Sequence, residues 1–478
     1  MASFEPTEWE HWQTFIEVAQ ITFIGYFVAL TLVYLLLNIL SYVFIQRYMR
    51  DYDNSLLPES YGPLLPPVSV LVPAYNEEAN IVASVKSILQ LEYARYEVIV
   101  INDGSKDGTL AQLQQAFDLK LHPEAYRQQL PTQAVKGVYR AEEYPQLRVI
   151  DKANGGKADA LNAGINAARY PLFCAVDADS ILQRDSLQRI ARPFIDQTET
   201  VAVGGSIRVA NGSTIRHGLL TKVGLPRSLL ANFQVIEYLR AFLFGRMGWS
   251  PLNGMLIISG AFGLFRKSAV HEVGGYQPAT IGEDMELVVR LHRHYSASKT
   301  PYHIAFIPDP VCWTEAPEDL GTLRNQRIRW QRGLLESLSK NRNLAFSKNS
   351  RVVGWLAYPF MLIFEGVGPL LEVLAYVLSA YFYVVDAVSV EFTIAFVAAA
   401  FGFGVLMSLF SLILEELTFR TYTSKRALLK LIFVAILENF GYRQLNSWWR
   451  VRGLWQWARG RKHNWGTMKR VGSINSNK

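Results

Sequence analysis

Cysteine is scarce in this chain: Cys174 and Cys312 are the only two among 478 residues. Both lie in apolar surroundings, so we expect buried free thiols and neither a disulfide nor a metal site built on thiolates. This usage fits a protein kept in a reducing compartment.

Acidic residues are nearly absent from the C-terminal part of the chain. Residues 418–478 contain 13 Lys and Arg but one acid, Glu438, whereas the whole chain has a net charge of +7. The same region carries five tryptophans: Trp448, Trp449, Trp455, Trp457 and Trp465. Trp with Lys and Arg beside apolar runs is typical of a membrane interface. We therefore expect this region to contact a lipid bilayer and not to bind nucleic acid.

Long apolar runs are few, and this excludes a transporter with many membrane spans. Half of the residues are hydrophobic and the mean hydropathy is +0.10, which indicates a soluble domain joined to a modest membrane part. Residues 21–45 and 392–414 are each long enough to span a bilayer. Residues 352–385 are interrupted by Pro and Gly, so we expect an interfacial helix at 352–365 and a span at 367–385. The shorter run at 428–437 predicts a further interfacial helix.

Basic residues flank these runs unevenly. Arg47 and Arg50 follow the first run and Arg420 and Lys425 follow the last, whereas the connector 386–391 has no Lys or Arg. The positive-inside rule then places the N-terminus outside and the intervening domain in the cytosol. We expect a multi-pass protein of the inner or plasma membrane.

Short runs rich in Val and Ile alternate with helical patterns in the segment after the first span. They predict buried strands at 68–72, 96–102, 148–151 and 172–176, with helices at 78–91 and 158–168. This alternation favours an α/β fold with a parallel sheet. We expect four regions: an N-terminal segment with one span at 1–50, an α/β domain at 51–345, an interfacial helix and about two spans at 346–417, and a basic tail at 418–478.

Acidic motifs follow several of the predicted strands. They are Pro73–Glu77, Asn102–Ser105, Asp177-Ala178-Asp179 and Gly282-Glu283-Asp284. Each motif alone is common in turns and helix caps. Together they fall where parallel sheets bind ligands, at the carboxyl ends of strands. Carboxylates there can hold Mg²⁺ or Mn²⁺, which a nucleotide diphosphate needs as a counter-ion.

Two basic motifs can complete a diphosphate site. Asn154–Lys157 precedes a predicted helix, and its glycines let the backbone approach an anion at the helix N-terminus; a plain loop with a surface lysine is the alternative. In the second motif, Gln326–Arg332, helical spacing puts Gln326, Arg329 and Trp330 on one face. A solvated basic helix would not explain Trp330, whose aromatic face suits a sugar ring.

Together these residues resemble the processive family 2 glycosyltransferases, the group of cellulose, chitin, hyaluronan and poly-N-acetylglucosamine synthases. Five separated motifs occur in the order of that family: Asp103-Gly104, Asp177-x-Asp179, Glu283-Asp284, Gln326-x-x-Arg329-Trp330 and Trp465–Arg470. The resemblance implies a GT-A fold, which is a doubly wound, mainly parallel α/β domain, joined here to transmembrane and interfacial α-helices.

The resemblance also implies a role for each matching residue. The nucleotide of a UDP-sugar would contact Ala74, Tyr75, Glu77, Asp103, Lys157, Asp177, Arg327, Arg329 and three residues of a mobile gating loop, Trp465, Thr467 and Lys469. Asp179 would bind Mg²⁺ or Mn²⁺ directly, assisted by Asp177. Asp284, next to Glu283, would be the catalytic base, and the acceptor would contact Gln326, Trp330 and Gly260.

Three features depart from the family pattern. Gly282 stands where the family usually has Thr, which alters the backbone before Glu283. Met468 stands where hyaluronan synthases carry Arg, which argues against hyaluronan as the product. About three spans are fewer than polymer-secreting members have, so an export channel within this one chain is not predicted.

The predicted activity is inverting, metal-dependent transfer from a UDP-sugar to a growing polysaccharide, forming β-glycosidic links at the cytosolic membrane face. One alternative within enzymes is transfer of a single sugar to a lipid-linked acceptor, although such enzymes lack the Gln-x-x-Arg-Trp motif. A non-catalytic scaffold or nucleotide sensor is the alternative from another class; the presence of Asp179, Asp284 and Trp330 argues against it. A second copy of the chain or an accessory export subunit stays open as a partner.

Overall fold

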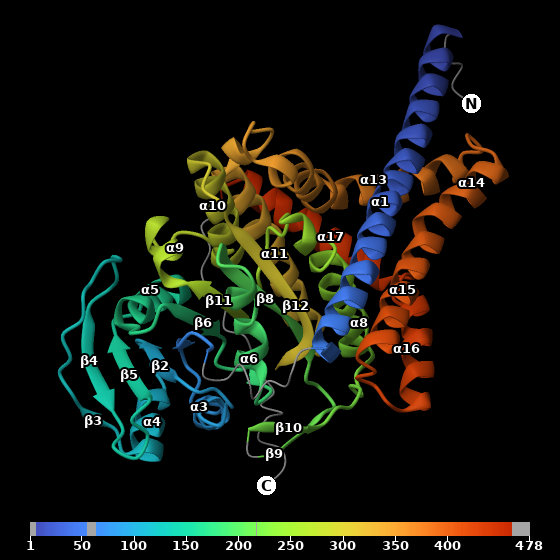
Figure 1. Cartoon of the computed structure of the whole chain (residues 1–478). Helices are drawn as coiled ribbons and strands as arrows, with labels where there is room; N and C mark the ends of the chain where they lie inside the picture. The colour runs from blue at the N-terminus through green and yellow to red at the C-terminus, as the bar shows by residue number, and fades with distance from the viewer. Residues whose placement is uncertain (1–5, 55–63, 217, 461–478) are drawn as a thin grey trace.

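The computed structural model describes residues 6–54, 64–216 and 218–460. A ten-stranded sheet forms the centre of an α/β domain, and long helices stand at one side of it (Figure 1). The strand order is β3-β4-β5-β2-β1-β6-β11-β8-β12-β7. The strands of this sheet are β1 (Val68–Ala74), β2 (Tyr96–Asp103), β3 (Lys120–Leu121), β4 (Val135–Arg140), β5 (Leu147–Lys152), β6 (Leu172–Val176), β7 (Ile181–Leu182), β8 (Thr200–Val209), β11 (Phe262–Arg266) and β12 (His303–Thr314).

Parallel pairing joins the four central strands β5, β2, β1 and β6. Strand β11 then pairs antiparallel with both β6 and β8, so the sheet is mixed. Almost every residue of β1 and β2 is buried, as expected for strands covered on both faces. The predicted α/β domain with its parallel core is therefore confirmed, and antiparallel strands are added at both sides of that core. Strands β9 (Thr214–Arg216) and β10 (Leu219–Lys222) form a separate pair.

Helices cover the faces of the sheet. The helices of the domain are α3 (Ile81–Ile88), α4 (Thr109–Phe117), α5 (Lys157–Ala167), α6 (Ser186–Ala191), α7 (Pro193–Asp196), α8 (Leu229–Leu239), α9 (Lys267–Glu272), α10 (Glu283–Ser298) and α11 (Leu320–Lys340), with the π-helical segment η1 (Arg240–Arg246) continuing α8. Helix α5 packs closely on β1 and β2. A Cβ placed on Gly164 would lie only 3.0–3.2 Å from the side chains of Ile101 and Leu71, so this close packing depends on a glycine there. Cys174 and Cys312 are buried free thiols, as predicted.

Within the described residues, three helical segments are long and apolar enough to cross a membrane: His11–Arg50, Val353–Val384 and Val390–Thr418. The first lies in α1 (Pro6–Asn54), and the others contain α12 (Tyr358–Phe360), α13 (Gly368–Val384), α14 (Val390–Val397) and α15 (Phe403–Thr418). The expected interfacial helix and span at 352–385 form one helical run, because π-helical turns at Val353–Ala357 and Met361–Val367 accommodate Pro359 and Pro369. The chain ends, within its described part, in α16 (Lys425–Leu437) and α17 (Tyr442–Ala458).

Carboxylates in these helices face protein partners. Glu365 accepts hydrogen bonds from Tyr34 of α1 at 2.5 Å and from Arg450 of α17 at 2.7 Å. Glu372 accepts from Ser447 of α17 at 2.5 Å. Such pairing would offset much of the cost of burying these acids in a membrane, and it ties α1, the helical run Val353–Val384 and α17 together.

Candidate active site

Asp103 ends β2 and organises the loop before α5. Its Oδ1 accepts from Lys152 Nζ at 2.5 Å and from the Gly155 N–H at 3.0 Å, and its Oδ2 accepts from the Gly156 N–H at 2.7 Å and from Asn154 Nδ2 at 3.1 Å. A carboxylate has about four acceptor positions, and here all four are filled. Asp103 is only 3% exposed. In this conformation it shapes the Gly155-Gly156 turn, and a contact with the ribose would require one of these bonds to be exchanged.

Lys157, the first residue of α5, joins three predicted site elements. Its Nζ forms an ion pair with Asp177 at the end of β6, lies 3.8 Å from Glu283 Oε1, and donates to the Gly260 carbonyl at 3.4 Å. Burial alone would lower the pKa of Lys157, but Asp177, Glu283 and Asp284 outweigh burial and raise it above its ordinary value. Lys157 is therefore a fixed cation at the edge where the sheet ends.

Asp284 and Glu283 begin α10 but lie in different environments. Asp284 is partly exposed, and its two oxygens accept from the Gly260 N–H at 3.1 Å and the Met285 N–H at 2.8 Å. Glu283 is only 7% exposed. Burial raises the pKa of Glu283 to about 7, with Lys157 opposing the rise and Asp284 adding to it. Of the two carboxylates, Asp284 is the one that a substrate hydroxyl can reach.

Asp177 and Asp179 flank the buried Ala178 directly after β6, and both are partly exposed. Ala178 and Asp179 form a turn after the strand, so both carboxylates lie beside the end of β6. Among the described residues there is no group of three or more His, Cys, Asp or Glu side chains that could hold a metal by itself. Two carboxylates nevertheless fit Mg²⁺ or Mn²⁺, which usually take one or two protein carboxylates and complete their shell with phosphate oxygens and water.

Ala74 is the last residue of β1, and the loop after it carries Tyr75 and Glu77. Ala74 is buried and Tyr75 is 43% exposed. The Glu77 N–H donates to Thr109 Oγ1 at 2.9 Å, so this loop lies against the segment that follows Asp103. Tyr75 is thus an exposed ring close to the carboxyl ends of β1 and β2.

Helix α11 presents the Gln-x-x-Arg-Trp motif. The buried Arg327 donates to Glu237 of α8 at 2.7 Å, and its guanidinium lies 4.3 Å from the centre of the Trp330 ring. Trp330 is 45% exposed. Gln326 Oε1 is buried and has no hydrogen-bond partner within the part of the chain that the structure describes. Arg327 is therefore engaged in fixing Trp330 and Glu237, while Gln326 and Trp330 keep groups free for a ligand.

Trp465, Thr467 and Lys469, the predicted residues of a gating loop, lie outside the described part of the chain. Arg329 is partly exposed on α11, one residue before Trp330. The structure thus brings Lys157, Asp177, Gly260, Glu283 and Asp284 together and leaves the tail residues as a prediction.

Arg246 in η1 is a candidate that the sequence analysis missed. Its Nε and Nη1 are buried and have no hydrogen-bond partner among the described residues, and its guanidinium lies 3.8 Å from the centre of the Phe242 ring. Burial lowers the pKa of Arg246 to about 10, and Asp284 and Tyr238 are the charged neighbours that oppose this. The available signal was a lone arginine in the apolar segment 241–249. π-Helical turns also occur often at functional sites.

Comparison with known proteins agrees with this arrangement. Residues 69–274 match Glycosyl transferase family 2, and residues 172–412, half of the chain, match Glycosyl transferase family group 2. The poly-β-1,6-N-acetyl-D-glucosamine synthase of Staphylococcus epidermidis RP62A is 29% identical over 65% of this chain and 64% of that protein. The enzyme of the same name from Staphylococcus aureus COL is 31% identical over 63% and 62%. The chain thus matches somewhat less than two thirds of the length of these relatives.

A solved structure shares the fold. The mannosyltransferase of Pyrobaculum calidifontis, in complex with GDP-Man and Mn²⁺, aligns with a TM-score of 0.51 over 92% of this chain and 100% of that one, at 17% identity. This similarity supports the GT-A architecture alone. The family matches and the assembled acidic edge lead to one assignment: the chain belongs to Glycosyl transferase family group 2 and is a family 2 glycosyltransferase.

Proposed function

We propose that this glycosyltransferase moves a sugar from a UDP-sugar to the end of a growing polysaccharide at the cytosolic membrane face. The observation that carries the proposal is the setting of Asp284. Its partly exposed carboxylate is held by the N–H groups of Gly260 and Met285, beside the ion pair of Lys157 and Asp177. This grouping supports a base at Asp284 and a site for the donor diphosphate beside Lys157, at one edge of the sheet.

Asp284 would act as the general base. It removes the proton from the acceptor hydroxyl while that oxygen attacks C1 of the donor sugar. The new C1–O bond forms as the bond from C1 to the phosphate oxygen breaks, and the electron pair leaves with UDP. A single displacement inverts the α-linked donor into a β-linked product.

Lys157 and the N-terminus of α5 would stabilise the departing UDP, because both present positive charge at the end of the sheet. Asp177 and Asp179 would hold Mg²⁺ or Mn²⁺. When bound, such a cation neutralises charge on the leaving diphosphate. The Mn²⁺ in the archaeal mannosyltransferase complex is consistent with this choice.

Trp330 and Gln326 would bind the acceptor. Trp330 offers an exposed ring and Gln326 an unpaired carbonyl oxygen, the two kinds of group that a sugar face and a sugar hydroxyl require. The product named for the staphylococcal relatives makes UDP-N-acetylglucosamine the first donor to test. The three candidate spans support a multi-pass protein, and the basic residues that follow the first and last apolar runs favour an α/β domain in the cytosol.

A screen of UDP-sugars with the purified full chain in lipid nanodiscs, with Mg²⁺ or Mn²⁺, tests the proposal. We expect one donor to yield UDP together with a product of many sugar units. Release of UDP with only a single sugar attached to lipid would instead support the non-processive alternative. No UDP release from any donor under either metal would contradict the proposed reaction.

A further inference from the structure

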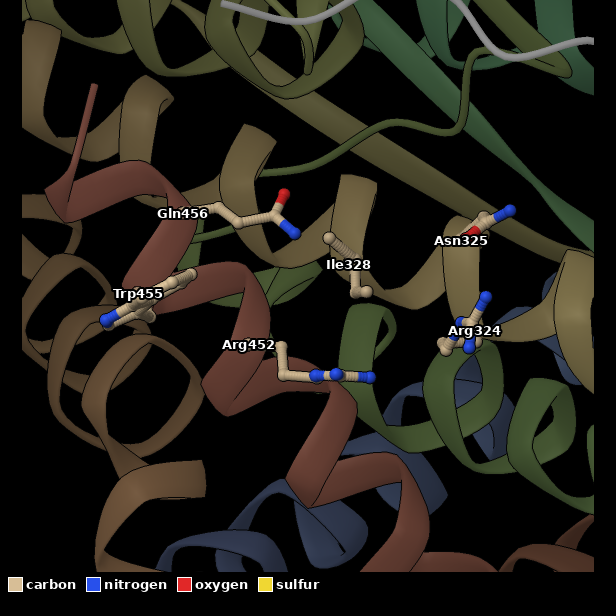
Figure 2. Close-up of a pocket in the computed structure, with 6 residues that line it drawn as sticks. All are labelled: Arg324, Asn325, Ile328, Arg452, Trp455 and Gln456. Atoms are coloured by element: carbon tan, nitrogen blue, oxygen red, sulfur yellow. The ribbon is translucent and has the colours of Figure 1, made fainter. Parts of the chain in front are cut away.

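A hollow of about 330 Å³ lies between helices α11 and α17. Figure 2 shows its lining: Arg324, Asn325 and Ile328 come from α11, and Arg452, Trp455 and Gln456 come from α17. In that view the side chain of Arg452 extends from α17 toward the part of α11 that bears Arg324. The two guanidinium groups therefore belong to one concave surface.

This hollow is separate from the active site. A Cβ placed on Gly453 of α17 would lie 2.9 Å from the Ile328 carbonyl oxygen and from Gln331 Cβ, so this face of α11 is the one packed on α17. Gly333 instead packs against Gly282, just before the catalytic Asp284. At about 100° per residue, Ile328 and Gly333 lie on nearly opposite sides of the helix. A ligand in the hollow would contact α11 from behind the acceptor site.

The hollow carries unbalanced positive charge. Neither Arg324 nor Arg452 forms an ion pair within residues 6–54, 64–216 and 218–460, and no carboxylate lines the hollow. A third cation, Arg459, lies 3.9 Å from the centre of the Trp455 ring. Two exposed guanidinium groups around one hollow match a phosphate group, which accepts several hydrogen bonds from arginine.

The exposed face of α17 is of the kind found at a membrane surface. Trp448, Arg452, Trp455 and Arg459 are all exposed and follow one another at helical spacings of 4, 3 and 4 residues. Alternating Trp and Arg on one face is typical of the headgroup region. The other side of α17 is anchored to the second candidate span through Ser447 and Glu372 at 2.5 Å.

The C-terminal tail fits the hollow poorly as an alternative occupant. Residues 461–478 contain five Lys and Arg and no Asp or Glu, so their charge has the same sign as that of the hollow. An anion at the membrane surface has the opposite charge to the lining residues and would lie at the level of the Trp and Arg face of α17.

We propose that this hollow binds the phosphate of an anionic lipid headgroup, held by Arg324 and Arg452 with Trp455 at the level of the glycerol backbone. Because the ligand contacts both α11 and α17, its binding stabilises their packing at Gly453. The site is independent of the sugar-transfer chemistry, so its test uses lipid binding as the readout.

The test is a titration of the detergent-solubilised full chain with phosphatidylglycerol, with the bound lipid counted by native mass spectrometry. The variant R324Q/R452Q removes both charges and keeps polar side chains of similar length. The control R95Q/R127Q removes two exposed arginines of the α/β domain. Each basic residue near a membrane surface contributes roughly 1 kcal/mol to the binding of an anionic lipid, and each 1.4 kcal/mol is about a factor of ten in affinity. We therefore expect R324Q/R452Q to bind phosphatidylglycerol about 30-fold more weakly than the wild type. The control should bind it as the wild type does.

Parallel arms identify the source of the phosphate. Phosphatidylcholine should not compete, and inorganic phosphate should compete only weakly because it lacks the membrane anchor. Unchanged phosphatidylglycerol binding by R324Q/R452Q, or an equal loss in the control, would overturn the site. Full displacement by inorganic phosphate at the lipid's own concentration would overturn the lipid as its ligand. Unchanged UDP affinity in both variants would show that they fold.

Discussion

Gly282 and Gly333 pack backbone against backbone, joining the loop that precedes Glu283 and Asp284 to helix α11. A Cβ on Gly282 would lie 3.0 Å from Gly333 Cα, and a Cβ on Gly333 would lie 2.9 Å from Gly282 Cα. A side chain larger than that of glycine therefore has no room at either position. The loop before Glu283 and Asp284 and the helix with the Gln-x-x-Arg-Trp motif thus approach closely because both positions lack a side chain.

We therefore predict that Gly333→Ala and Gly282→Thr lower both stability and turnover. Overpacking of this kind costs about 1–3 kcal/mol, and it moves α11 away from the base. Chemical denaturation and steady-state kinetics measure the two effects. Gly402→Ala is the matched control, because a Cβ there meets nothing within 4 Å and helical Ala is favoured over Gly. Wild-type turnover in Gly333→Ala would show that the contact does not position the base.

Glu283 should make stability depend on pH. Its pKa is raised by burial to about 7, so the folded state holds this proton more tightly than the unfolded state does. The stabilisation is complete below the ordinary pKa of a glutamate and is lost as pH rises through about 7. Relative to Glu283→Gln, which cannot ionise, the wild type should lose stability between pH 5 and 8 by at most about 1.4 kcal/mol per pH unit. Denaturant unfolding at several pH values measures this difference, and parallel curves for the two proteins would exclude it.

Arg246 should contribute to substrate binding at the expense of stability. Arg246→Met keeps the apolar contact with Phe242 and removes a buried cation whose Nε and Nη1 have no partner. We expect the variant to unfold at a higher temperature, while kcat/KM falls by about 10–100-fold, the value of a hydrogen bond to a charged group. UDP affinity should stay unchanged if the lost partner is the sugar. A variant that keeps full activity would remove Arg246 from the site.

Asp179 should control metal-dependent nucleotide binding. Asp179→Ala removes one of the two carboxylates that follow β6, so UDP affinity in the presence of Mg²⁺ or Mn²⁺ should fall to the level that the wild type shows with EDTA. Calorimetric titration with and without EDTA measures this. Wild-type affinity in the variant, or affinity of the wild type that EDTA does not change, would contradict a metal at this position.

Much of the framework could be predicted from local sequence. The buried strands at 68–72, 96–102 and 172–176 agree closely with β1, β2 and β6, because uninterrupted Val and Ile runs specify buried parallel strands. Three of the acidic motifs follow β1, β2 and β6 as predicted, whereas Gly282–Asp284 lies at the start of helix α10 and not at the end of a strand. The continuous helix at 353–384 was not predicted, because Pro and Gly usually end a helix and here π-helical turns absorb them.

The features of the site that could not be predicted depend on contacts between residues that are distant in the sequence. Asp103 is saturated by Lys152 and the Asn154–Gly156 loop, and Arg327 is engaged by Glu237 of α8. The hydrophobic periodicity of the sequence does not indicate such pairings. Arg246 could not be predicted because the feature that singles it out, buried guanidinium nitrogens without a hydrogen-bond partner in the described chain, exists only in the folded structure.

The most direct test of the account compares Asp284→Asn with the wild type in two assays on the same preparation, sugar transfer and UDP binding. The substitution keeps the shape of the side chain and one of the two acceptor oxygens that Gly260 and Met285 contact, but it removes the base. We predict loss of transfer by about 10²–10⁴-fold, the usual contribution of general-base catalysis, with UDP affinity nearly unchanged. Transfer at the wild-type rate would contradict Asp284 as the base.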